Sequence, residues 1–92
     1  MAANRFQEIG RYLRDKRIKK KLTQAEVAKK LGYRSQFIAN FERGASSPPW
    51  KALRKIVAIY GIPEREITNF LVNQYHSLVK EELFGIRKSK RR

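Results

Sequence analysis

Apolar residues recur every three or four positions along most of the chain, and this spacing places side chains on one face of an α-helix. The first segment with this pattern predicts a helix over residues 4–20. Its inward row is formed by Phe6, Ile9, Gly10, Leu13 and Arg17. A capping box at residues 23–26 (TQAE) then predicts a second helix that begins at Gln24. Gly32 is its expected stop, because glycine tolerates the left-handed conformation that often ends a helix.

Two further helices are predicted by the same reasoning. Ser35 is the expected N-cap of a third helix that ends at Gly44. A fourth helix spans residues 49–60 and is closed by Gly61. The residues expected to face inward from these two helices are Ile38, Phe41, Leu53, Ile56, Val57 and Tyr60. No strand pattern or internal repeat is present, so the sequence predicts an all-α fold.

A fifth helix is expected to begin at Pro63, which suits a first turn, and to extend to residue 84, roughly 30 Å in all. Its apolar stripe consists of Ile67, Phe70, Leu71, Tyr75, Leu78, Val79 and Leu83. A head of four short helices over residues 1–62 can cover only part of this stripe, and soluble monomers avoid large exposed apolar patches. We therefore predict a homodimer through residues 63–85; the alternative is that the helix folds back onto its own core. Residues 86–92 are expected to form a flexible basic tail.

Charge indicates the class of partner. The 92 residues contain 22 Lys and Arg against 8 Asp and Glu, a net charge of +14. Such a charge favours a polyanion, most simply nucleic acid. Residues 63–85 differ from the rest because they carry two basic and four acidic side chains. We expect this segment to contact neither nucleic acid nor a membrane surface, which attracts helices with Lys and Arg on the polar face.

Several other functional classes lack support. The chain has no cysteine, which excludes disulfides, thiolate zinc sites and a thiol nucleophile. His76, the only histidine, has no second ligand at metal-binding spacing, and no catalytic pair appears. We therefore expect no enzyme activity, metal or cofactor. No apolar run could span a membrane and no signal peptide is evident, so a cytoplasmic location is expected.

Two short helices joined by a tight glycine turn form a helix-turn-helix, whose second helix fits the major groove of DNA. Ile38 and Phe41 attach one face of that second helix to the core. The opposite face carries Ser35, Gln36, Asn40 and Arg43. An amide can bond N6 and N7 of adenine together, which lysine cannot do. Gln36 and Asn40 are therefore candidates for reading base sequence.

The stretch LTQAEVAKKLGYRSQFIANFERGASSPPWKAL resembles the Cro/phage-repressor type of helix-turn-helix protein, also called the XRE family. The resemblance extends over residues 13–62. It is carried by Thr23, Gln24, Ala28, Leu31, Gly32, Ile38, Glu42, Arg43, Gly44 and Pro48. It implies a compact lambda-repressor-like domain of four helices, to which the fifth helix is added. It also implies an internal salt bridge between Arg17 and Glu42.

The same resemblance implies roles in DNA binding. Ser35, Gln36 and Asn40 are expected to face base edges, while Phe37 either presses on a thymine methyl group or packs against the protein. We expect phosphate contacts from Lys20, Gln24, Arg34, Arg43 and Ser46. Gln24 is also expected to support the reading helix.

Two features concern the surroundings of this helix. Pro49 stands where the family often has a serine cap, so Ser47 is the expected cap of the fourth helix. The residues expected to be core or boundary aromatics, and not a base-stacking platform, are Tyr33, Phe37, Trp50 and Tyr60.

The preferred interpretation is a dimeric, sequence-specific regulator of transcription that binds double-stranded DNA and reads a palindromic operator, in a bacterium or phage. A second interpretation is an antitoxin-like autoregulator whose C-terminal helix binds a protein partner. A third is an RNA-binding or ribosome-associated basic protein.

Overall fold

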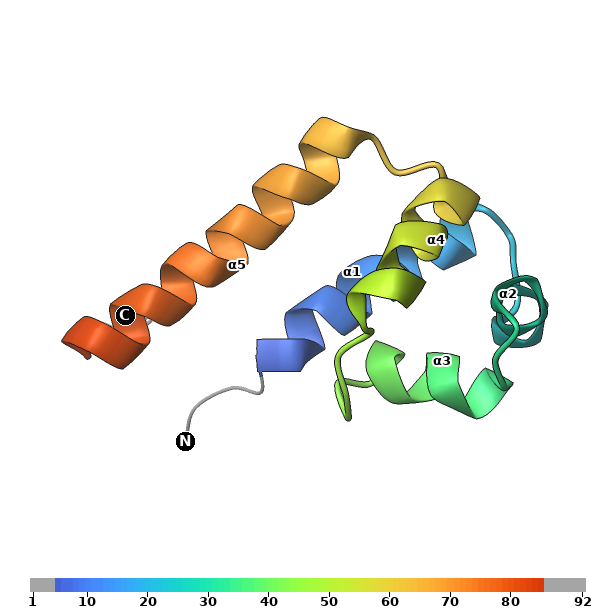
Figure 1. Ribbon diagram of the computed structural model, residues 1–92, viewed down its shortest axis with the longest axis horizontal. Coiled ribbons are helices and arrows are strands. Elements are labelled where there is room, and N and C mark those ends of the chain that lie inside the picture. Colours follow the sequence, from blue (N-terminus) through green and yellow to red (C-terminus); the bar gives the residue numbers. More distant parts are fainter. Residues whose placement is uncertain (1–4, 86–92) are drawn as a thin grey trace. The chain divides into compact units, whose positions relative to one another are not determined.

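The structure, a computed structural model, describes residues 5–85, with side chains from residue 7 onward. Its helices are α1 (Arg5–Lys19), α2 (Gln24–Leu31), α3 (Ser35–Glu42), α4 (Trp50–Tyr60) and α5 (Glu64–Phe84) (Figure 1). No strand occurs in this range, so the all-α prediction is confirmed. The chain divides into two compact units between Ile62 and Pro63. Residue 4, the side chain of Phe6 and the expected tail at 86–92 lie outside the described residues.

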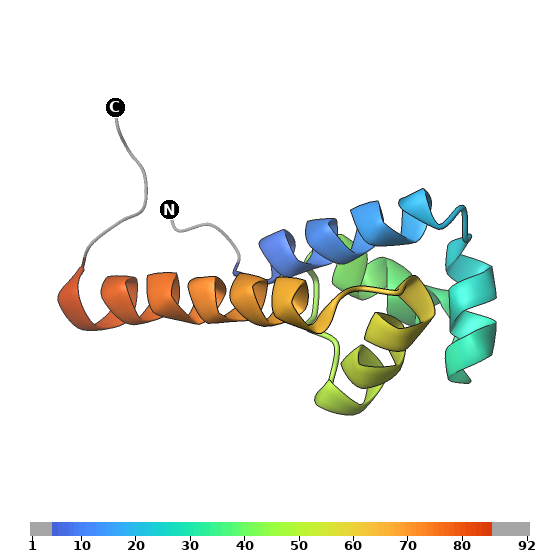
Figure 2. The same ribbon diagram turned by 90° about the horizontal axis from the view of Figure 1, so that it is seen from above.

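Helices α1 to α4 belong to the first unit and enclose one apolar core (Figures 1 and 2). Helix α3 packs against α1 and α2, and α2 also packs against α4. The buried apolar residues are Ile9, Leu13, Val27, Ala28, Leu31, Ile38, Phe41, Ala52, Leu53, Ile56, Tyr60 and Ile62. Val57, which was predicted to face inward, is only half-buried. The buried stripe of α4 includes Ala52, and Val57 therefore lies at its edge.

Both ends of α2 follow from local sequence. The Thr23 hydroxyl accepts a hydrogen bond from the Glu26 amide at 3.0 Å, and the Glu26 carboxylate accepts one from the Thr23 amide at 2.8 Å. This is the reciprocal capping box that the sequence predicts, and it satisfies two backbone donors of the first turn. Gly32 ends the helix with a φ of 79°, a left-handed conformation that a side chain would disfavour.

Two predicted caps are absent. Ser35 is the first helical residue of α3, and Arg34 holds the cap position without a side-chain hydrogen bond. The prediction of Ser35 as N-cap is therefore wrong, because a cap needs an extended backbone and Ser35 is already helical. At α4 the cap position is held by Pro49, again without a side-chain bond, so the prediction of Ser47 as cap is also wrong. Ser35 and Ser47 are both exposed.

The second unit contains α5, a helix of 21 residues. Ile67 is buried, and the apolar residues that are more than half exposed are Val72, Tyr75, Leu83 and Phe84. Phe70, Leu71, Leu78 and Val79 are half-buried. Across residues 5–85, no helix combines the length and the apolar character that a membrane span requires. The helix therefore presents a mixed surface on which large apolar side chains reach solvent.

Gly10 sets how closely α1 approaches α3. A Cβ atom at this position would overlap the carbonyl oxygen of Phe41 and lie 2.8 Å from that of Glu42. Both contacts are with backbone atoms, which cannot move aside as a flexible side chain can. Glycine is therefore required here by close packing of two helices.

We expect Gly10→Ala to destabilise the protein by about 1–3 kcal/mol, the usual cost of overpacking. At an open helical site the same change would stabilise by about 1 kcal/mol, because alanine is the better helix former. Urea unfolding followed by circular dichroism measures the free energy of unfolding, and Gly10→Val is expected to cost more than Gly10→Ala. A gain of stability in Gly10→Ala would contradict the close approach of α1 and α3.

Candidate nucleic-acid interface

Helix α3 has one buried and one exposed face. Ile38 and Phe41 are completely buried, which attaches the helix to the core. On the other side Ser35 and Gln36 are exposed and Asn40 is half-buried. Burial of Ile38 and Phe41 on one face leaves the polar side chains of the opposite face in contact with solvent.

The predicted reading residues form a hydrogen-bonded row along α3. The side-chain oxygen Oδ1 of Asn40 accepts a bond from Gln36 Nε2 at 2.9 Å and another from Arg43 Nη2 at 2.7 Å. An amide oxygen has two lone pairs, so both are occupied. The Nδ2 group of Asn40 and the Oε1 atom of Gln36 remain available to a ligand. The row therefore holds two amides and a guanidinium in one relative arrangement.

The far end of α3 is anchored by a buried ion pair. Arg17 Nε donates to Glu42 Oε2 at 2.6 Å, and Arg17 Nη2 donates to Oε1 at 3.0 Å. Arg17 Nη1 also donates to the carbonyl oxygen of Leu22 at 2.7 Å. The hydrogen bond to Glu42 raises the pKa of the Arg17 guanidinium, so Arg17 stays protonated. Two parallel bonds between planar groups orient α1 and α3 as well as attract them.

Gln24 joins the same anchor from α2. Its Nε2 atom donates to Glu42 Oε1 at 3.0 Å, so three helices meet at one carboxylate. This is the supporting contact that was expected of Gln24. One N–H of the Gln24 amide thus bonds inside the protein. Its second N–H and its side-chain oxygen are available to a ligand.

The other predicted phosphate contacts lie on the surface. Lys20, Arg34, Arg43 and Ser46 are exposed. Arg43 belongs to the polar row of α3, whereas the Lys20 ammonium lies beside Gly61 at the end of α4. A cation is favoured at a helix C-terminus, so the position of Lys20 is favourable for α4.

The aromatic residues near α3 differ from one another. Phe37 is half-buried and stacks on Tyr33, with ring centroids 4.2 Å apart, and it meets Phe41 edge-on. Phe37 thus packs against the protein. Trp50 is 74% exposed, so its prediction as a core or boundary residue is wrong. It is the first residue of α4, where the helix extends beyond the core.

Tyr60 lies close to the ion pair without bonding to it. Its hydroxyl is buried and has no hydrogen-bond partner among the described residues. Burial raises the pKa of Tyr60 to about 12, the Glu42 carboxylate adds to the rise, and Arg17 opposes it. The ring therefore contributes packing, and its hydroxyl stays protonated at neutral pH.

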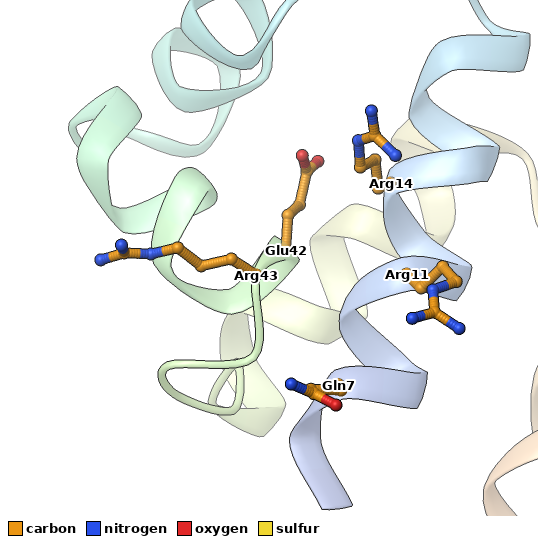
Figure 3. Close-up of a pocket in the computed structure, with 5 residues that line it drawn as sticks. All are labelled: Gln7, Arg11, Arg14, Glu42 and Arg43. Atoms are coloured by element: carbon orange, nitrogen blue, oxygen red, sulfur yellow. The ribbon is translucent and has the colours of Figure 1, made fainter. Parts of the chain in front are cut away.

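Sequence reasoning missed a basic pocket between α1 and α3. It is lined by Gln7, Arg11, Arg14, Glu42 and Arg43 (Figure 3). Gln7, Arg11 and Arg14 are separated by four and three positions, which is the spacing of one helical face. This polar spacing can be read from the sequence of the same helix that carries the apolar row, and it could have predicted the basic face. Within residues 5–85 no group of His, Cys, Asp or Glu could hold a metal ion.

Comparison with known proteins places the chain beside a domain family and a curated repressor. The model of the helix-turn-helix domain family matches residues 8–70, well over half of the chain. The transcriptional repressor RstR of the cryptic phage CTXphi, from Vibrio cholerae, is 32% identical over 57 residues. That alignment covers 62% of this chain and 51% of the relative, so the chain spans about half of that protein's length. No solved structure matches significantly.

The buried pair is expected to be non-additive in stability. Arg17→Met or Glu42→Leu alone leaves an unpaired buried charge and should cost about 3–5 kcal/mol. The double variant should lose much less than the sum, because neither charge remains. Chemical unfolding of the four proteins measures the coupling. Simple additivity would contradict the view that Glu42 and Arg17 compensate each other.

Proposed function

The chain belongs to the helix-turn-helix family, of the Cro/phage-repressor type that its motifs resemble, and from this premise we propose that it is a sequence-specific transcriptional regulator that binds double-stranded DNA. The observation that carries the proposal is the polar face of α3, which a buried anchor holds outward. The net charge of +14 supplies the attraction for a polyanion. The similarity to a phage transcriptional repressor supports the same conclusion.

We assign the main base contact to Gln36. Its Oε1 atom can accept from adenine N6, and its second Nε2 hydrogen can donate to N7, while the first remains on Asn40. Asn40 has no free lone pair on Oδ1, so in this arrangement it reads a base only as a donor through Nδ2. Ser35, at the exposed start of α3, adds a less selective hydroxyl.

Phosphate contacts are proposed to position this reading face. Arg34 and Arg43 lie just before and just after α3, where they can hold the backbone on either side of the groove. Ser46 and the free part of the Gln24 amide add neutral donors, and Lys20 adds a charge. These contacts carry no sequence information but supply most of the affinity, which should fall steeply with salt.

We further propose that α5 joins two copies of the protein. Val72, Tyr75, Val79 and Leu83 follow one another at intervals of three, four and four positions, close to the 3.5-residue period of a helix seam. Three of these four side chains are more than half exposed. A second copy offers the same row, and two-fold pairing would bring two α3 helices to a palindromic site about 34 Å apart.

Charge also favours this placement of the dimer contact. Residues 63–85 carry two basic and four acidic side chains, whereas the remaining sequence is strongly basic. A surface of this sign is repelled by phosphate and is free for a protein contact while the first unit holds DNA. A different protein on the same row, as in an antitoxin-like regulator, is the alternative that the second test below distinguishes.

The role of Gln36 is tested on DNA selected from a random library. Gln36→Ala should cost about 1–3 kcal/mol on the selected site and little on random duplex, because a base contact discriminates. Binding isotherms at fixed salt measure both. Equal weakening on the two DNAs would make Gln36 a backbone contact.

The role of α5 is tested by sedimentation of the purified protein. Tyr75→Glu with Leu83→Glu should convert a dimer to a monomer and weaken binding to a two-half-site duplex by about 10²-fold or more, since the second contact is no longer linked to the first. Asn73→Glu adds a single charge at an exposed polar position of the same helix and should leave the dimer intact. A wild-type protein that sediments as a monomer at all concentrations contradicts the dimer and leaves the row for another partner.

A further inference from the structure

We propose that the pocket between α1 and α3 binds a further phosphate of the DNA backbone, so that α1 extends the interface beyond the helix-turn-helix. This inference rests on the proposed function and names an additional contact within it. The pocket residues on α1 are Gln7, Arg11 and Arg14.

The pocket has an excess of positive charge. Three arginines and one carboxylate line it, and that carboxylate, Glu42, is already paired with Arg17, which is not a lining residue. Arg11 and Arg14 are exposed, and neither forms an ion pair with a residue in the described range. Like charges around one opening repel each other, and an anion between them removes that repulsion.

The chemistry of the lining fits a phosphate. Guanidinium groups present paired donors that match phosphate oxygens, and the Gln7 amide adds a neutral donor. Figure 3 shows Arg11 and Arg14 on the α1 side of the pocket and Glu42 on the α3 side. The pocket lining is thus polar on both helices.

Arg43 connects the pocket to the reading face. Its side chain lines the pocket, and its Nη2 atom bonds Asn40 on the polar row of α3. Figure 3 shows the Arg43 guanidinium directed away from α1, so this residue borders both the pocket and the proposed DNA-binding face. For this reason we assign the pocket to a backbone phosphate of the duplex, and free inorganic phosphate, which shares the chemistry, becomes an arm of the test.

The test compares Arg11→Gln/Arg14→Gln with Arg54→Gln/Lys55→Gln, which removes the same charge from exposed positions of α4. Loss of a phosphate contact should weaken binding about tenfold or more, equally on selected and random duplex. The slope of log K against log salt should become shallower by about 0.9 for each phosphate lost, thus about 1.8 for a dimer. The α4 variant should keep the wild-type slope.

Three outcomes are informative. If the slope of Arg11→Gln/Arg14→Gln equals that of the α4 variant, the pocket does not hold a DNA phosphate and the inference is overturned. If inorganic phosphate raises the melting temperature of the wild type more than that of Arg11→Gln/Arg14→Gln, while the DNA slopes agree, the site takes free anion and the inference is again overturned. If the wild type binds no duplex, including the selected site used to test Gln36→Ala, the proposed function itself is refuted.

Discussion

The carboxylate of Glu42 is the point on which the first unit depends. It receives bonds from Arg17 on α1 and Gln24 on α2, and it belongs to α3. An isolated helix of eight residues is unstable in water, so α3 exists only where its neighbours hold it. Apolar burial of Ile38 and Phe41 supplies attraction but little directional control. The bidentate ion pair supplies direction, because two parallel hydrogen bonds between planar groups fix their relative orientation.

The Arg17–Glu42 ion pair also affects which charges near α3 remain uncompensated. Because Arg17 and Glu42 neutralise each other inside, the remaining arginines near α3 act outward without an internal counter-charge. The cost appears at Tyr60, whose buried hydroxyl has no partner among the described residues although the ion pair lies close by. An unpaired buried hydroxyl costs about 1–3 kcal/mol, so here ring packing outweighs hydrogen bonding. Residues 63–85 carry four acidic and two basic side chains, so their surface differs in charge from the basic surface of the first unit.

Sequence reasoning succeeded where the cause of a structure is local. The capping box before α2 and the left-handed Gly32 involve residues within a few positions of each other, and both occur as predicted. It failed where the cause is tertiary. Whether Ser35 caps α3 or begins it depends on how the chain leaves Gly32, and whether Trp50 is buried depends on where the core ends. The basic face of α1 was visible as a spacing, but nothing local shows that it lies opposite the end of α3.

If α3 reads DNA as proposed, the hydrogen-bonded row of Gln36, Asn40 and Arg43 would couple base recognition to backbone contact. Asn40 holds Gln36 with one lone pair and Arg43 with the other, so the position of the guanidinium affects the position of the amide that faces a base. A phosphate that binds the Arg43 guanidinium would compete for the Nη2 group, which donates to Asn40 in this structure. If the bond persists, the phosphate fixes the row and sharpens readout; if it breaks, Asn40 regains a lone pair and can read adenine with both amide atoms. Under the proposed function, sequence preference at Asn40 would therefore depend on whether Arg43 keeps its bond to Asn40.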